Sequence, residues 1–197
     1  MSDAILSMAR PITLVQPARL EIGAGAVSRL AEWADAYSRI FVVAMAPTVG
    51  FVSRIGLKGT VETFVDIPPE PDLPAVEAVL AAARAFKPDL VIGLGGGSVM
   101  DVAKLVAVLW DSEQSILDVV GPNKVIGRRT ALAQVPTTSG TGSEAGIRSL
   151  VTNPETLAKL AKRDQSQKGI KVRYVEYSPL QNLAKNSINP FFDFTLL

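Results

Sequence analysis

Three consecutive glycines followed by a serine are the residues of this chain best suited to binding an anion: Gly95, Gly96, Gly97 and Ser98. They follow the apolar run 90–94 and precede a second apolar run, so the pattern predicts a buried strand, a tight turn and a helix. Glycines let a ligand approach the main chain, and the first amides of a helix lie at its positive end. The sequence therefore predicts an anion site here, most often for phosphate.

A purely structural role also fits these residues. Ser98 followed three residues later by Asp101 matches a capping box, in which the serine covers a helix amide and the carboxylate reaches back to the cap. Capping does not require three glycines. Asp101 and Lys104 lie three residues apart on a predicted helix, 99–110, that is otherwise apolar, so we expect them to share one side and to pair.

A second loop of similar character follows a predicted strand at 130–135. Residues 136–144 are Pro-Thr-Thr-Ser-Gly-Thr-Gly-Ser-Glu, a segment dominated by hydroxyl and amide donors. Such donors suit phosphate and ribose oxygens. Taken alone, the segment is equally well explained as a flexible surface loop. Two such loops, each directly after a buried strand of one sheet, are less easily explained by chance.

The elements that must position these loops alternate along the chain. Strands are predicted at 12–22, 39–45, 60–67, 90–94 and 130–135, and helices at 27–37, 49–55, 74–86 and 99–110. This order predicts an α/β fold, a doubly wound, mostly parallel, Rossmann-like sheet with helices on both faces. Ligands bind at the carboxyl ends of the strands in such sheets, which is where both loops fall.

Composition excludes several classes of function. The 197 residues carry a formal net charge of +1, which provides no electrostatic footprint for nucleic acid or an anionic membrane. No stretch approaches the roughly twenty apolar residues of a membrane span, and no signal-peptide pattern is present, so we expect a cytoplasmic protein. The chain has no histidine and no cysteine. Any metal would have to be held by carboxylates and carbonyls, which excludes a nitrogen-rich zinc or iron site.

The glycine loop matches neither of two common nucleotide motifs. Ser98 stands where G-x-G-x-x-G needs its last glycine, and a Walker loop needs a lysine after its glycine. The loop, with Asp101 and Lys104, instead resembles the G-G-G-S-x-x-D-x-A-K signature of the iron-containing (group III) alcohol dehydrogenase family. Residues 136–144 resemble that family's P-T-T-x-G-T-G-S-E segment, and residues 153–159 resemble the stretch after it. The resemblance covers about residues 10–161, within which the chain is also similar to the maleylacetate reductase branch.

The resemblance implies a dinucleotide-binding domain, residues 1–161, that takes NAD or NADP. In the family a separate C-terminal helical domain holds Fe or Zn, and hydride passes between the nicotinamide and a small alcohol or carbonyl. The residues to which the resemblance assigns cofactor binding are Gly95, Gly96, Gly97 and Ser98 at the pyrophosphate, Thr137, Thr138 and Ser139 at phosphate and nicotinamide-side oxygens, Lys159 at the nicotinamide ribose, and Asp101. For Asp101 we favour a structural role over direct catalysis. No residue is assigned to catalysis or to metal binding.

Two segments depart from the family pattern. The family commonly has an acid after the strand 39–45, where it binds the adenosine ribose, but residues 44–48 are Ala-Met-Ala-Pro-Thr. Without that carboxylate, a 2′-phosphate would not be repelled, so NADP use becomes compatible with the site. Residues 162–197 form an atypical tail, with a strand pattern at 170–177 and an apolar end, where the family continues into its metal domain. A shifted reading frame, a fusion or a truncation would each explain this tail.

These observations lead to two main hypotheses. In the first, the chain is the NAD(P)-binding portion of an iron-containing alcohol dehydrogenase-like oxidoreductase and lacks effective hydride transfer alone. Its partners would be a dinucleotide and, in the full-length enzyme, a small-molecule substrate, with a homo-oligomer left open. In the second, it is a non-catalytic fragment that associates with itself or a partner through an exposed apolar surface. A phosphoryl-transfer protein is a third alternative, opposed by the missing P-loop lysine.

Overall fold

The computed structural model describes residues 17–121, 124–128, 130–146, 148–154, 173–176 and 194–196. The helices of this part are α2 (Val27–Ala34), the 3-10 helix η1 (Val49–Phe51), α3 (Val52–Ile55), α4 (Leu73–Phe86) and α5 (Gly97–Leu109). Its strands are β1 (Leu20–Glu21), β2 (Arg39–Ala44), β3 (Thr60–Phe64), β4 (Leu90–Gly95), β5 (Ala131–Pro136), β6 (Arg148–Val151), β7 (Arg173–Glu176) and β8 (Phe194–Leu196).

Six of these strands form one parallel sheet in the order β1-β8-β5-β4-β2-β3. β2, β4 and β5 form its centre, and all but one of the residues of β2 and all of those of β4 are buried. Continuous apolar runs of this kind are expected for parallel strands covered on both faces. The strands β6 and β7 pair antiparallel in a separate two-stranded sheet.

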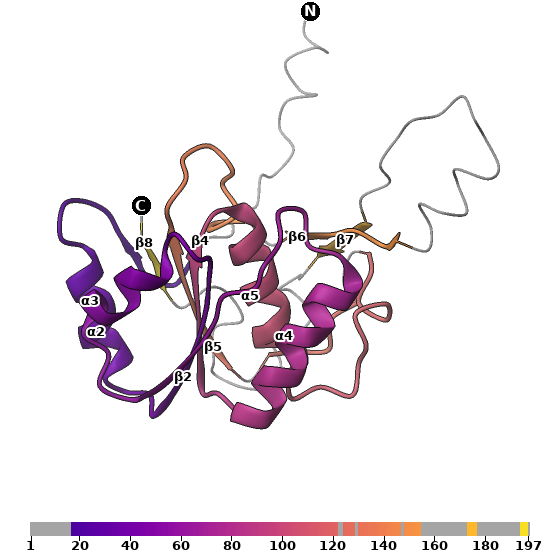
Figure 1. Ribbon diagram of the computed structural model, residues 1–197, viewed down its shortest axis with the longest axis horizontal. Coiled ribbons are helices and arrows are strands. Elements are labelled where there is room, and N and C mark those ends of the chain that lie inside the picture. Colours follow the sequence, from indigo (N-terminus) through magenta and orange to yellow (C-terminus); the bar gives the residue numbers. More distant parts are fainter. Residues whose placement is uncertain are drawn as a thin grey trace, which may run out of the picture.

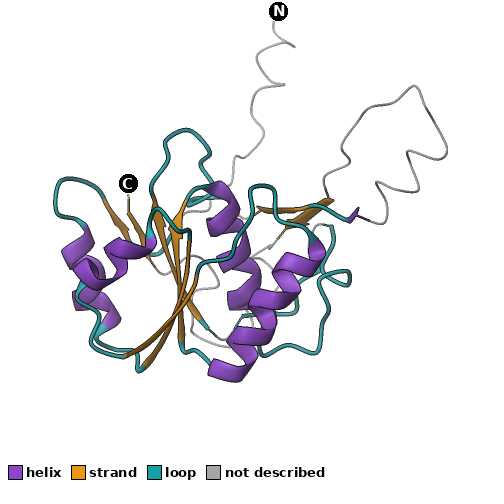
Figure 2. Cartoon of the chain, viewed as in Figure 1, coloured by secondary structure: helices purple, strands orange, loops and turns teal. Residues whose placement is uncertain are grey.

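Helices cover both faces of the six-stranded sheet, so the predicted doubly wound α/β architecture is confirmed (Figure 1). Alternate residues of a strand point to opposite faces. Phe41 and Val91 pack with α4 and α5, whereas Ile40 and Ile92 pack with α2 and α3. Figure 2 shows the strands lying between these two helical layers.

The strand order reverses between β2 and β4. The chain leaves β2 toward α3 and β3 on one side, and it leaves β4 toward α5 and β5 on the other. The two connections pass over opposite faces, because α3 and α5 belong to different core clusters. In doubly wound sheets such a reversal opens a crevice at the carboxyl ends of the strands, and that crevice is where ligands bind.

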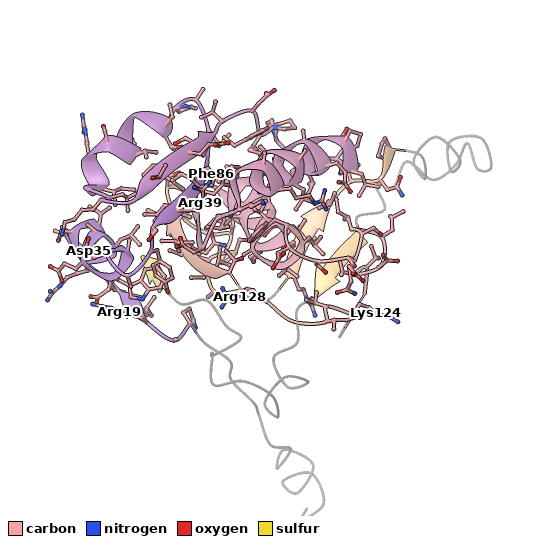
Figure 3. All side chains as sticks on the ribbon, turned by 90° about the horizontal axis from the view of Figure 1, so that it is seen from below. Arg19, Asp35, Arg39, Phe86, Lys124 and Arg128 are labelled. Atoms are coloured by element: carbon pink, nitrogen blue, oxygen red, sulfur yellow. The ribbon has the colours of Figure 1, made fainter. Side chains whose placement is uncertain are left out.

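The opposite, amino edge of the sheet is fastened by side chains. Arg39 Nε donates to the Phe86 carbonyl at the end of α4 (2.8 Å), and its guanidinium lies 4.5 Å from the centre of the Phe86 ring (Figure 3). The Asp89 carboxylate accepts from the amides of Ser38 and Arg39, each at 2.8 Å. These contacts join the start of β2 to the turn between α4 and β4, far from the crevice.

Most predicted elements are present with shifted ends. The predicted strand 60–67 ends at Phe64, and the predicted helix 27–37 ends at Ala34. Of the predicted strand 12–22, the described part contains Leu20–Glu21. The strand pattern at 170–177 corresponds to β7. The described part also contains β6 and β8, which were not predicted as strands.

Candidate functional site

The helix α5 begins at Gly97, with Gly96 as its N-cap and no side-chain cap. The capping box predicted for Ser98 and Asp101 is therefore wrong: Ser98 lies inside the first turn, and the Asp101 carboxylate bonds elsewhere. Ser98 Oγ accepts a long hydrogen bond from the amide of Glu70 (3.4 Å). No side chain therefore caps the start of α5, and its first amides lie at the carboxyl edge of the sheet.

The glycines are required for space. None of Gly95, Gly96 and Gly97 has a positive φ. A Cβ at Gly95 would lie 2.9 Å from a side chain in the first turn of α5, closer than real Cβ contacts. A Cβ at Gly96 would lie 3.2 Å from Thr138 Oγ1, and one at Gly97 would lie 3.3 Å from Thr141 Cγ2. Their lack of a side chain therefore lets the loop after β5, residues 137–146, approach the start of α5; we call this segment the hydroxyl loop.

The hydroxyl loop 137–146 follows β5, directly beside the glycine loop. Gly95 and Pro136 are opposite each other in the β4–β5 ladder, and the Thr137 amide donates to the Gly95 carbonyl (3.0 Å). The loop rises in orange at the edge of the sheet where α5 begins (Figure 1). Thr137, Thr138 and Ser139 are all exposed. The predicted meeting of the two loops is confirmed, and the three hydroxyl residues at their junction are exposed.

A buried threonine, which the sequence analysis missed, joins the loop after β2 to β4. Thr48 is 8% exposed, and its Oγ1 accepts from the Met45 amide (3.1 Å) and donates to the Leu94 carbonyl (3.0 Å). The bond crosses the point where the strand order reverses. Its sequence signal was a hydroxyl residue just after the end of a buried strand. The loop carries no carboxylate at residues 44–48.

Asp101 lies beneath the hydroxyl loop, one turn along α5 from the glycines. It is 6% exposed and pairs with Lys104, whose Nζ lies 2.8 Å from Asp101 Oδ1. The same oxygen accepts from Ser143 Oγ, and Oδ2 accepts from the Leu150 amide of β6 (2.9 Å). The predicted pairing is confirmed, and each carboxylate oxygen has a partner across the loop or on β6.

Lys104 fastens the far end of the loop from below. Its three N–H groups are shared among Asp101 and four further oxygens within hydrogen-bond distance of Nζ: the Ser143 carbonyl (3.1 Å), Ser143 Oγ (3.0 Å), the Gly146 carbonyl (3.2 Å) and the Arg148 carbonyl. Burial lowers the pKa of Lys104, and the Asp101 carboxylate opposes that shift. The sequence analysis did not find Ser143, Gly146 or Arg148 as partners because they lie about forty residues farther along the chain.

Three further observations concern Lys159, metal binding and membrane spanning. Lys159 lies outside the described residues, so its contact with the nicotinamide ribose stays a prediction. Among the described residues, no three His, Cys, Asp or Glu side chains are grouped so that they could hold a metal ion. None of the described helices has the length and apolar character needed to cross a membrane.

A parallel sheet with helices on both faces and a glycine loop at its strand-order reversal places the chain among the doubly wound α/β domains, which bind ligands at the carboxyl ends of their strands. The chain belongs to the iron-containing alcohol dehydrogenase family, whose model matches residues 17–168. It is 31% identical over 149 residues to an alcohol dehydrogenase of Thermococcus barophilus, a match that covers 68% of this chain and 39% of that protein. It is 41% identical over 111 residues to long-chain-alcohol dehydrogenase 1 of Geobacillus thermodenitrificans, which covers 53% of this chain and 26% of the relative.

Solved structures share the fold. The sulfoacetaldehyde reductase of Bifidobacterium kashiwanohense, solved in complex with NAD+, superposes with a TM-score of 0.73 at 26% identity. That superposition covers 95% of this chain and 46% of the reductase. The chain therefore spans less than half the length of these relatives.

Proposed function

We propose that this chain binds NAD(P) across the carboxyl ends of β2, β4 and β5, as the cofactor-binding portion of an alcohol dehydrogenase-type oxidoreductase. The observation that carries the proposal is the convergence of the glycine loop and the hydroxyl loop beside the strand-order reversal. Crystallisation of a related reductase with NAD+ supports the choice of a dinucleotide.

In the proposed site, separate groups of residues contact three parts of the dinucleotide. The pyrophosphate lies against Gly95, Gly96, Gly97 and Ser98, where the first amides of α5 and its positive end favour negative charge. The nicotinamide half lies on the β5 side, where Thr137, Thr138 and Ser139 offer hydroxyl donors. The adenosine half lies on the β2 side, over residues 44–48. Lys159 remains a proposed contact of the nicotinamide ribose.

Both NAD and NADP are compatible with this arrangement. A carboxylate after β2 would bind the adenosine ribose hydroxyls and repel a 2′-phosphate. Residues 44–48 contain none. We therefore expect NADPH to bind within about tenfold of NADH, a difference of about 1.4 kcal/mol or less.

The residues of this chain do not fit the metal of the family. A chain without histidine or cysteine offers no imidazole or thiolate ligand, and the described carboxylates form no cluster of three. We derive no reaction step through a metal. When bound, the cofactor supplies hydride chemistry, and the part proposed for this chain is to hold and orient it.

Fluorescence titration of the full 197-residue chain with NADH and NADPH tests binding. We expect saturation by both cofactors. Gly96→Val should weaken NADH binding about tenfold or more, because its branched side chain fills the space between the glycine and hydroxyl loops. Gly50→Val is the matched control, since a Cβ at Gly50 would meet nothing within 4 Å. Absence of saturation at millimolar cofactor would contradict the proposal.

A separate assay tests hydride transfer. The chain is mixed with NAD+ or NADP+ and simple primary alcohols, and reduced nicotinamide is followed by absorbance. We expect no turnover by this chain alone. Turnover without any added chain would overturn this half of the proposal while leaving cofactor binding intact.

The proposal also covers localisation, substrate class and self-association. We propose a cytoplasmic protein whose family relatives act on a small alcohol or carbonyl substrate, with the maleylacetate reductase branch as one assignment. We also propose that the chain can associate with itself, which light scattering after size-exclusion chromatography measures. A clean monomer with a cooperative melt would count against association through an apolar surface.

A further inference from the structure

We propose that the buried Asp101–Lys104 pair positions the hydroxyl loop 137–146 on the nicotinamide side of the cofactor, with Ser143 as the group through which it acts. The three side chains are positioning residues and touch no reacting atom. This inference rests on the proposed function, and it assigns the pair a role beyond stabilising the fold.

The burial of the Asp101–Lys104 pair indicates a role beyond stability. Asp101 and Lys104 are each 6% exposed on a helix that is otherwise apolar between Val99 and Leu109. Taking two charges out of water is costly, and apolar residues of similar size are often as stabilising as a buried ion pair. Stability alone therefore gives little reason for charges here. What apolar residues could not supply is a directional set of bonds to the loop.

The bonds of the pair converge on the far end of the loop and on β6, where the Leu150 amide donates to Asp101 Oδ2 and the Arg148 carbonyl accepts from Lys104 Nζ. Ser143 Oγ donates to Asp101 Oδ1, while the Ser143 carbonyl, Ser143 Oγ and the Gly146 carbonyl accept from Lys104 Nζ at 3.0 to 3.2 Å. The near end is held by the bond from the Thr137 amide to Gly95. The exposed hydroxyls of residues 137–141 lie between these two anchors. Their position over the glycines is therefore set at one end by the sheet and at the other by the pair.

The pair and the pyrophosphate site are parts of one rigid element. Asp101 follows Gly97 by four residues, about one turn of α5. The helix therefore fixes both the amides proposed to face the pyrophosphate and the charges that hold the loop. Because the loop lies on the β5 side of the glycines and residues 44–48 lie on the β2 side, loosening the pair should affect the nicotinamide half more than the adenosine half.

Two variants and two ligands test this. Ser143→Ala removes the hydroxyl bonds from the loop, and Asp101→Asn removes the charge while keeping the size of the side chain. NADH carries both halves of the dinucleotide, whereas ADP carries only the adenosine and the two phosphates. Dissociation constants for both ligands are measured on the full-length chain, with circular dichroism as the check on folding. Ser115→Ala is the matched control, because it also removes a serine–carboxylate bond (Ser115 Oγ to Asp118, 2.7 Å), on an exposed loop after α5.

We expect Ser143→Ala and Asp101→Asn to weaken NADH binding about three- to tenfold, because each loosens the far end of the loop, and to change ADP binding by no more than about twofold. Ser115→Ala should change neither constant. A role limited to fold stability would leave the ratio of the two constants unchanged, and that result would overturn the inference. If Asp101→Asn does not fold, Ser143→Ala decides alone, since its side chain is only partly buried. Failure of the wild type to bind either ligand would instead refute the proposed function, and the inference with it.

Discussion

Substituting Gly93 by alanine tests whether the space above β4 is as tightly filled as the structure indicates. Gly93 lies in the buried strand β4, opposite Gln134 of β5. A Cβ at this position would lie 2.3 Å from Gln134 Oε1 and 2.9 Å from the Cβ of Ala103 on α5, where ordinary contact begins at 3.4 Å. The glycine is thus required because a neighbouring side chain occupies its face.

The magnitude follows from what must move. Gln134 is fully buried, and its Nε2 donates to the Met100 carbonyl (3.1 Å), so it cannot swing away without breaking that bond. Overpacking of a core costs about 1 to 3 kcal/mol, and a lost hydrogen bond costs about 1 kcal/mol. We therefore expect Gly93→Ala to lower the free energy of unfolding by about 2 to 4 kcal/mol. For a chain of this size, that corresponds to a fall in Tm of roughly 4 to 16 °C.

Urea unfolding followed by tryptophan fluorescence measures the effect, since the two tryptophans, Trp33 and Trp110, belong to opposite faces of the sheet. Gly50→Ala is the control, because its added Cβ has open space. The double variant Gly93→Ala/Gln134→Ala sharpens the test. It removes the 2.3 Å contact and leaves the one to Ala103, so the cost of Gly93→Ala should fall to about 1 kcal/mol in that background. An unchanged cost there, or no cost in the wild-type background, would refute this account of the packing.

Three further predictions use the same unfolding measurement. Arg39→Met should lower the free energy of unfolding by about 1 kcal/mol, because it removes the guanidinium bonds and the ring contact at Phe86. NADH affinity should stay within about twofold of wild type. A larger change would show that the amino edge of the sheet is not independent of the cofactor site. Asp72→Ala should lower the free energy of unfolding by about 1 kcal/mol, because the Asp72 carboxylate accepts from the Ala75 amide (2.9 Å) at the start of α4. Asp72→Asn should retain most of the stability. A loss for Asp72→Asn as large as that for Asp72→Ala would argue against capping. Because burial lowers the pKa of Lys104, the unfolded chain binds more protons than the folded chain between the lowered value and 10.5, so stability should rise with pH across that window. The difference in free energy of unfolding between wild type and Lys104→Met should therefore grow from neutral pH toward about 10.5, and a flat difference would contradict the sign.

The fold could be predicted because its strongest signals are local. Continuous apolar runs fixed β2, β4 and β5 to within about a residue, and the three-to-four-residue spacing of apolar positions did the same for α4. The side-by-side placement of the two loops followed from the rule that ligands bind at the carboxyl ends of parallel strands. The strands β6 and β8 were not predicted, because four and three residues are too few for an alternating pattern to stand out.

The site was harder to predict where its bonds are long-range. The pattern Ser98-x-x-Asp101 suggested a local cap, but Asp101 bonds to Ser143 and Leu150, which lie 42 and 49 residues farther along. Those tertiary bonds outcompete the local one, and no spacing within the helix could reveal them. The structure requires the glycines for space and not for backbone conformation: Gly96 and Gly97 closely approach the hydroxyl loop, and Gly95 closely approaches Val99 of α5.

The long-range partners of the Asp101–Lys104 pair have a consequence for how the chain folds. Until residues 143–150 dock, α5 carries two charges on its inner side with no protein partner from β6 or the hydroxyl loop. We expect that segment to dock late, after the main folding transition state, because its contacts with Asp101 span 42 and 49 residues and closing so long a loop costs entropy. Interactions formed after the transition state act on the unfolding rate more than on the folding rate. The pair would thus govern how long the folded domain persists once formed, and stopped-flow unfolding of Ser143→Ala, faster than wild type with an unchanged refolding rate, is the kinetic signature we expect.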